Sequence, residues 1–184
     1  MPRSPVIRAA AAVAAVVLIV IGWYLGSPLF IRTTVDEPLP TVAAGALTPP
    51  AASPPASFAA ESMPPASKTT FSHRGQLQYV DGLHHGEGTV LLGVAATCCP
   101  VGDRYFLRFE DVAITNAPDV HVYLSKDRGG KWNDATSKYL GPLRATNGSF
   151  NYDLAPADAG EYQSVIVWCR AFSVLVTWAD LDRS

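Results

Sequence analysis

Short runs of strand-forming residues, separated by turn signals, fill the chain from residue 88 to residue 178. None of these runs has the apolar spacing of a helix. Several short strands with regular turns are typical of two packed antiparallel sheets. The pattern therefore predicts an all-β fold, an antiparallel β-sandwich of about seven to nine strands, in a domain over residues 71–184. The runs are Gly88–Ala95, Arg104–Phe109, Val120–Ser125, Leu140–Ala145, Ser149–Leu154, Ser164–Cys169 and Phe172–Trp178.

Asn147 and Gly148 give the clearest local turn signal in this domain. They separate the run that ends at Ala145 from the run that begins at Ser149. Both residues tolerate the positive φ angles that a two-residue β-turn requires. The dipeptide therefore predicts a hairpin between these two runs.

The N-terminal part of the chain has a different pattern. No charged residue lies between Arg8 and Arg32, and small or aliphatic residues dominate the interval. At about 1.5 Å per residue the run is long enough to cross a bilayer. It predicts a transmembrane helix over residues 9–31, an uncleaved signal anchor. A cleaved signal peptide is the alternative, but the run is long for one and no Ala-x-Ala site follows it.

Charges on either side of the predicted helix indicate its orientation. Basic residues precede it and acidic residues follow it, so residues 1–8 are expected in the cytoplasm and the C-terminal domain outside. The chain would then be a single-pass plasma-membrane protein. Residues 32–70 are rich in Pro and Ala and offer little to bury, which predicts a disordered linker that holds the domain away from the membrane.

Charge and motif content exclude several function classes. The chain has 14 basic and 16 acidic residues and no basic stripe. Nucleic acid is not expected as a partner, because phosphate binding needs clustered Lys and Arg. No Gly-x-Ser-x-Gly, His-Glu-x-x-His, Cys-x-x-Cys or phosphate-binding glycine-rich motif occurs. These observations favour an electron-transfer or binding module over a turnover enzyme.

The chain has three cysteines, Cys98, Cys99 and Cys169. An odd number leaves at least one thiol unpaired, or pairs it with another molecule. A bond between the adjacent Cys98 and Cys99 is strained, so a disulfide from one of them to Cys169 is the more natural pairing. Cys169 lies in the apolar run Val165–Val176, and its alternative role is that of an inert thiol packed as a small hydrophobic residue.

His84 and His121 are the histidines considered as partners of Cys169. His121 lies on a predicted strand and shares one face of it with Tyr123. Thiolate and imidazole are usual protein ligands of haem iron and of soft transition metals, so Cys169 with His84 or His121 would suit such a group. The alternative is that both histidines are ordinary surface or hydrogen-bonded residues. The sequence assigns no particular metal.

Four segments resemble, in order, the motifs of the DM-thirteen electron-transfer domain family, which also occurs beside DOMON domains in Skeletor-type proteins. The segments are His84–Gly88, Asn116–Ser125, Leu140–Tyr152 and Ser164–Val174. The resemblance covers about residues 71–182. It implies a DOMON-like β-sandwich whose characteristic cysteine is Cys169, with a redox role either as a bare thiol or through a prosthetic group such as haem. A redox partner protein is implied as well.

The chain departs from the family pattern at two places. Ala117 replaces the Gly that usually precedes Pro-Asp. The segment Cys98-Cys99-Pro100 is not a motif of the family. A second hypothesis is a non-redox surface or structural module for a protein or glycan ligand, with Trp132 and Tyr139 at the loop 126–138 as its contact residues. The alternative for these two aromatic side chains is that they cap the sandwich.

Overall fold

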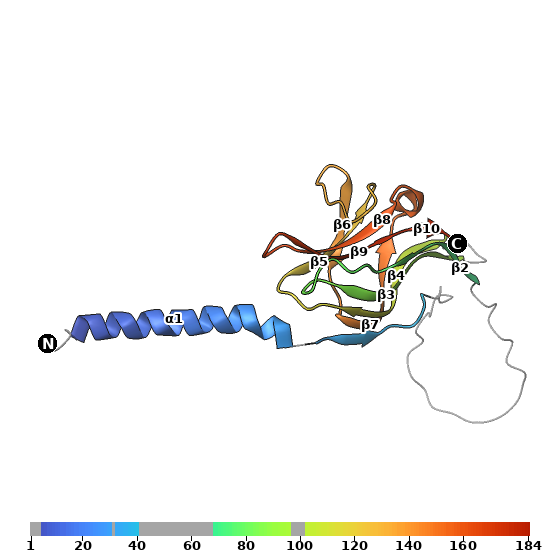
Figure 1. The fold of residues 1–184 in the computed structure, drawn as a ribbon. Helices are drawn as coiled ribbons and strands as arrows, with labels where there is room; N and C mark the ends of the chain where they lie inside the picture. Colours follow the sequence, from blue (N-terminus) through green and yellow to red (C-terminus); the bar gives the residue numbers. More distant parts are fainter. Residues whose placement is uncertain (1–4, 31, 41–67, 97–101) are drawn as a thin grey trace, which may run out of the picture.

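The protein folds into two β-sheets that pack face to face, preceded by one helix (Figure 1). The structure, a computed structural model, describes residues 5–30, 32–40, 68–96 and 102–184. The helix α1 (Pro5–Phe30) extends away from the sheets. The remaining elements are β1 (Thr34–Asp36), β2 (Lys68–Gln76), β3 (Gly86–Ala96), β4 (Arg104–Ile114), β5 (Val120–Ser125), β6 (Ser137–Pro142), β7 (Asn147–Leu154), the 3-10 helix η1 (Pro156–Gly160), β8 (Ser164–Cys169), β9 (Val174–Asp180) and β10 (Asp182–Arg183).

The two sheets differ in size and in strand order. The larger sheet has the order β1-β7-β4-β3-β2-β10, and the smaller sheet has the order β6-β5-β8-β9. All described strand pairs are antiparallel except β1 with β7, which is parallel. The β-sandwich predicted from the strand pattern is therefore confirmed.

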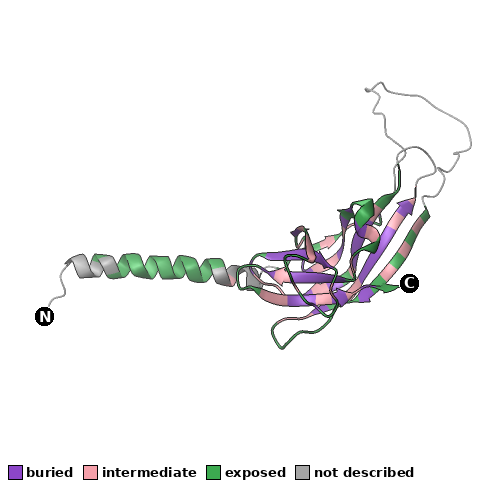
Figure 2. Cartoon of the chain, turned by 90° about the horizontal axis from the view of Figure 1, so that it is seen from above, coloured by how far each residue is buried: buried purple, intermediate pink, exposed green. Residues whose placement is uncertain are grey.

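The core lies between the sheets and is built from side chains that alternate along the strands (Figure 2). At its centre Phe109 of β4 stacks on Phe150 of β7, with ring centroids 5.0 Å apart, and meets Tyr152 edge to face. The smaller sheet contributes Val165 and Val167 of β8, both without exposed surface. Successive side chains of a strand point to opposite faces, so the apolar residues at every second position of these strands face the core.

The transmembrane helix predicted over residues 9–31 is wrong. Within the part of the chain that the structure describes, no helix combines the length and the apolar character that a membrane span requires. The prediction of a signal anchor fails with that of the transmembrane helix.

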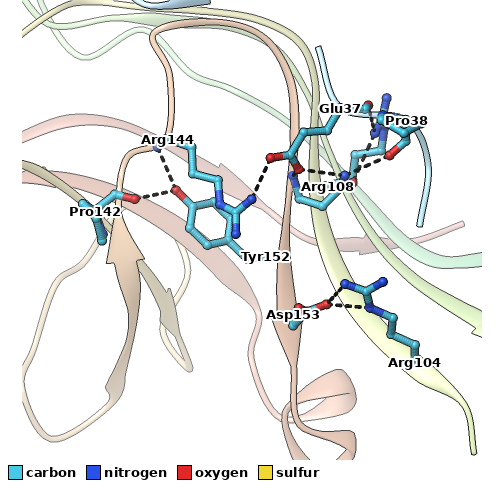
Figure 3. Close-up of polar contacts among 9 residues, drawn as sticks. Glu37, Pro38, Arg104, Arg108, Pro142, Arg144, Tyr152 and Asp153 are labelled. Carbon is cyan, nitrogen blue, oxygen red and sulfur yellow. Dashed lines mark hydrogen bonds and ion pairs between the residues drawn. The ribbon is translucent and has the colours of Figure 1, made fainter. Parts of the chain in front are cut away.

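The predicted hairpin at Asn147 and Gly148 is also wrong. β6 ends at Pro142 and pairs with β5, whereas β7 begins at Asn147 and pairs with β4 in the other sheet. Tyr152 stabilises the crossing between the sheets, because its hydroxyl donates to the carbonyl of Pro142 at 2.8 Å and accepts from the backbone N–H of Arg144 at 3.2 Å (Figure 3). Pairing with distant strands overrides the local turn preference.

Residues 32–70, predicted as a linker, contribute strands at both ends. Residues 34–36 form β1, and β2 begins at Lys68. Thr34 lies opposite Asn147 in the parallel pair, so β1 extends the edge of the larger sheet. Residues 41–67, which make up most of the predicted linker, lie outside the described residues.

Glu37 attaches the segment after β1 to β4 and β7 (Figure 3). Its carboxylate accepts hydrogen bonds from the backbone N–H and the side-chain amide of Asn151, at 3.0 and 3.1 Å, and pairs with Arg144 at 2.7 Å. Its backbone carbonyl accepts a hydrogen bond from Arg108. Burial opposes ionisation of the carboxyl, but the bonds from Asn151 and the charge of Arg144 outweigh it. The pKa of Glu37 is therefore held below its usual value.

We expect Glu37→Gln to lower the free energy of unfolding at pH 7 by about 1–2 kcal/mol, because charge-assisted hydrogen bonds are lost. Since folding lowers the pKa of Glu37, its contribution is present above about pH 4.5 and disappears as the pH falls through the folded value. Urea unfolding at pH 7 and at pH 3.5 measures both effects. Asp153→Asn, which removes only the exposed pair with Arg104, is the matched control and should change stability by less than about 0.5 kcal/mol. If wild type and Glu37→Gln differed as much in their free energy of unfolding at pH 3.5 as at pH 7, this role of Glu37 would be contradicted.

Candidate functional site

Cys169 lies at the end of β8 and faces the core. It is a free thiol without exposed surface, and it packs with Val165 and Val167 on the inner face of the strand. This is the face that strand alternation predicts. Its Sγ–H donates to the backbone carbonyl of Pro118 at 2.7 Å. Cys169 lies opposite Val120 of β5, so the thiol is enclosed on the side of the neighbouring strand as well.

Two loops flank the end of β8. Residues 115–119 lead from β4 to β5, and residues 170–173 form the turn from β8 to β9. The backbone N–H of Arg170 donates to the carbonyl of Asp119 at 3.0 Å, which joins the two loops. Each loop holds a non-glycine residue at positive φ, Asp119 at 59° and Ser173 at 53°. Such a conformation costs about 1–2 kcal/mol, and strained positions of this kind cluster at functional sites.

His121 lies on the other face of the smaller sheet. It is opposite Trp168 in the register of β5 and β8, one position from the pair that contains Cys169. The ring of His121 is hydrogen-bonded at both nitrogens, Nδ1 to the hydroxyl of Tyr139 at 2.9 Å and Nε2 to the carboxylate of Asp119 at 2.6 Å. Because successive side chains on a strand point to opposite faces, His121 and Cys169 do not meet.

His84 lies in the segment between β2 and β3. Its Nδ1 pairs with the carboxylate of Asp81 at 2.9 Å. The same carboxylate accepts the backbone N–H groups of Leu83 and His84. The hydrogen bond from His84, followed by that from Leu83, lowers the pKa of Asp81. The structure thus gives His84 a role in closing a surface turn. Cys98 and Cys99 lie outside the described residues, and their pairing stays a prediction.

A group of ring side chains and one guanidinium covers the outer face of the smaller sheet, and we call it the outer aromatic cluster. Its members are His121, Tyr123, Trp132, Tyr139, Trp168 and Arg170. Trp132 stacks on Trp168 with centroids 5.1 Å apart, and the guanidinium of Arg170 lies 4.4 Å from the ring centroid of Tyr139. All members except His121 line a cavity of about 440 Å³. Trp132 and Tyr139 therefore pack over the sheet, whereas 44% of Tyr139 remains exposed.

The model of one protein family matches this chain over residues 80–181, under the description "Electron transfer DM13". The chain belongs to the Electron transfer DM13 family. The matched DM13 domain runs from before β3 to the end of β9, so it holds both sides of the smaller sheet as well as Cys169. No curated protein and no solved structure matches the chain. The association with Skeletor-type proteins and DOMON domains stays a prediction.

The DM13 domain does not present Cys169, His84 and His121 as ligands of one haem. The thiol is enclosed in the apolar core, and His121 is on the opposite face of the same sheet. Both ring nitrogens of His121 have partners. No group of three or more His, Cys, Asp or Glu in the described part of the chain could hold a metal ion.

Two residues that organise the site, Asp119 and Arg170, were not among the residues predicted from the sequence. Asp119 fixes the ring of His121 through its side chain and contacts Arg170 through its carbonyl. The Nε–H of Arg170 donates to the hydroxyl of Tyr123 at 2.6 Å. A signal was available in the sequence, because Asp119 and Arg170 each adjoin a strand end beside a candidate residue.

Proposed function

We propose that the DM13 domain transfers electrons through the thiol of Cys169 by exchange with a disulfide of a redox partner protein. The observation that carries the proposal is a free thiol at a strand end, bound to the carbonyl of Pro118 and flanked by two loops with strained residues. Membership of an electron-transfer family supports a redox role for the domain. A bare thiol is favoured over haem because the thiol is enclosed in the core and His121 lies on the opposite face of the sheet.

The exchange proceeds through a mixed disulfide between Cys169 and the partner protein. Cys169 loses its proton, and the thiolate forms a bond to one sulfur of the partner disulfide. The bond between the two partner sulfurs breaks, and the leaving thiolate takes up a proton. One thiol of a second partner protein, which carries a reduced dithiol, then attacks the sulfur of Cys169 and releases the first partner with both of its thiols reduced. The other thiol of the second partner attacks the new mixed disulfide, closes a disulfide within that partner and releases Cys169. Two electrons have then passed from the dithiol of the second partner to the disulfide of the first, and the Cys169 thiol is regenerated.

Access to the thiol requires a local opening, because Cys169 has no exposed surface. The turn 170–173 consists of exposed residues, including Phe172 at 55% exposure. The described hydrogen bonds from this turn to the rest of the domain are those from Arg170 to Asp119 and to Tyr123. Segments of this kind open at much lower free energy than the paired strands of a core. The loop and the turn therefore act as the cover of the thiol.

We expect Cys169 to react with glutathione disulfide in the folded protein, more slowly than an exposed thiol because the cover must open first. The measurement uses the full chain with Cys98→Ser and Cys99→Ser, and mass spectrometry follows the mixed disulfide at Cys169. The variant that also carries Cys169→Ala is the control and should gain no adduct. Haem reconstitution of the same protein should give no Soret band.

The dependence on denaturant separates the proposal from an inert core cysteine. Local opening gives a rate that hardly changes at low urea concentration, because little surface is exposed. A core thiol reacts only through global unfolding, and its rate rises with urea over the whole range. The proposal would be overturned by a reaction rate that rises with urea over the whole range. It would also be overturned if no adduct formed below the unfolding transition.

A further inference from the structure

Tyr139, His121 and Asp119 form a hydrogen-bonded chain on the outer face of the smaller sheet. The hydroxyl of Tyr139 lies 2.9 Å from Nδ1 of His121, and Nε2 of His121 lies 2.6 Å from the carboxylate of Asp119. The imidazole is largely buried, at 9% exposure, whereas Tyr139 reaches solvent. The three groups come from the β5 strand, from the residue before it and from β6.

The carboxylate determines the direction of these hydrogen bonds. An ionised carboxylate only accepts, so Nε2 of His121 carries the hydrogen that Asp119 receives. In the neutral imidazole Nδ1 then has the free lone pair and accepts from the hydroxyl of Tyr139. The phenol thus has a base aligned on its proton, and Asp119 can balance the charge that the base acquires.

The charges around Tyr139 favour loss of its proton when it loses an electron. The guanidinium of Arg170 lies over its ring at 4.4 Å. A radical cation in that ring would meet this positive charge, whereas a neutral radical would not. Two further titratable groups, Tyr123 and Asp134, line the same cavity as Tyr139.

The outer aromatic cluster also connects Tyr139 to the strand of Cys169. Tyr139 contacts Tyr123 with centroids 5.3 Å apart, Tyr123 contacts Trp132 at 6.1 Å, and Trp132 stacks on Trp168 at 5.1 Å. Trp168 immediately precedes Cys169 in β8. Tyrosine and tryptophan are the side chains that lose single electrons most readily, so the contacts form a continuous series of oxidisable rings.

We propose that Tyr139 is a second redox site of the domain, a tyrosine that is oxidised with transfer of its proton to His121. One electron leaves the phenol for an outer-sphere one-electron oxidant, such as the metal centre of a redox partner protein. The O–H bond breaks, and the proton forms a new N–H bond at Nδ1 of His121. The products are a neutral tyrosyl radical and an imidazolium paired with Asp119. Reduction by one electron returns the proton and restores Tyr139.

This site rests on the electron-transfer role of the DM13 family but not on thiol exchange at Cys169. The experiment therefore uses the full chain with Cys169→Ala, in which thiol exchange is abolished. Hexachloroiridate(IV) serves as the one-electron oxidant, stopped-flow absorbance follows its reduction, and electron paramagnetic resonance identifies the radical. We expect a neutral tyrosyl signal that Tyr139→Phe removes. Tyr79→Phe is the matched control, because Tyr79 is 66% exposed and its contact is a ring stack with His85.

His121→Asn removes the base and keeps a side chain of similar size. We expect the oxidation rate to fall at least about tenfold, within the range of general-base effects. Oxidation of the parent protein should also be slower in D₂O, because the proton moves with the electron; this measurement needs no folded His121 variant. An unchanged rate in D₂O, or a radical that persists in Tyr139→Phe and disappears in Tyr79→Phe, would overturn the proposal. Failure of thiol exchange at Cys169 would leave all of these results unchanged.

Discussion

Phe109→Ala is expected to lower the free energy of unfolding by about 3–5 kcal/mol. Phe109 has no exposed surface, stacks on Phe150 and contacts Tyr152 at the centre of the sandwich. Truncation removes the apolar surface of the ring and leaves a cavity between two sheets whose backbones are fixed by strand pairing. A domain of this size has about 5–15 kcal/mol of stability in total. Phe109→Ala should therefore remove a large part of the free energy of unfolding.

Urea unfolding followed by tryptophan fluorescence measures this loss. Phe172→Ala is the matched control, since Phe172 is 55% exposed in the turn after β8. The same ring is removed there, but little buried surface is lost, so the change should be within about 0.5 kcal/mol. Equal losses in the two variants would mean that the stacked rings are not the centre of the core.

Gly148→Ala is expected to displace β1 and lower the stability by at least about 2 kcal/mol. Gly148 has a φ of 100°, and a Cβ there would lie 2.2 Å from the carbonyl oxygen of Val35. The backbone strain and the clash act together, and the clash falls on the backbone of β1, which has no room to relax within the pair. Loss of β1 also removes the hydrogen bond from Glu37 N–H to the carbonyl of Ser149.

Hydrogen exchange at the Glu37 amide measures the attachment of β1, and urea unfolding measures the stability. Gly129→Ala provides the matched control, because Gly129 has a φ of 74° and open space around the new Cβ. It should show the backbone strain alone, about 1–2 kcal/mol, with unchanged protection of Glu37. Retained protection at Glu37 in Gly148→Ala would contradict the account of this contact.

Short apolar runs bounded by turn signals were sufficient to place the central strands. Val120–Ser125 and Ser164–Cys169 are the bounds of β5 and β8 in the structure and of two of the predicted runs. Both strands are central in the smaller sheet, and almost every residue in them is buried, which is why they appear as apolar runs in the sequence. The alternation of side chains along a strand places Cys169 inward and His121 outward.

Other features depend on contacts between distant parts of the chain. Residues 34–36 form a strand only because β7 offers a free edge, and three residues carry too little pattern to predict this. The turn preference of Asn147 and Gly148 is real, but Gly148 uses its positive φ beside β1 instead of in a hairpin. An apolar composition over residues 9–31 predicted a membrane span that the described part of α1 does not provide.

The candidate site was predicted in part. Strand alternation put His121 and Tyr123 on one face, and both lie in the outer aromatic cluster. The partner of His121 on β6 was not predictable, because an irregularity in the register between Val122 and Tyr123 decides which residue of β6 faces it. The same register brings Tyr139 to the imidazole.

A redox-active Cys169 thiol should exchange with disulfides while the domain stays folded. The most direct measurement is an equilibrium titration of the full chain with Cys98→Ser and Cys99→Ser in buffers of defined glutathione redox ratio. Quantitative mass spectrometry gives the fraction of Cys169 in mixed disulfide, and circular dichroism of the same samples reports the fold. We expect one reversible transition of Cys169 between the thiol and the mixed disulfide while the sandwich stays folded. A thiol that remains reduced at every ratio until the protein unfolds would contradict it.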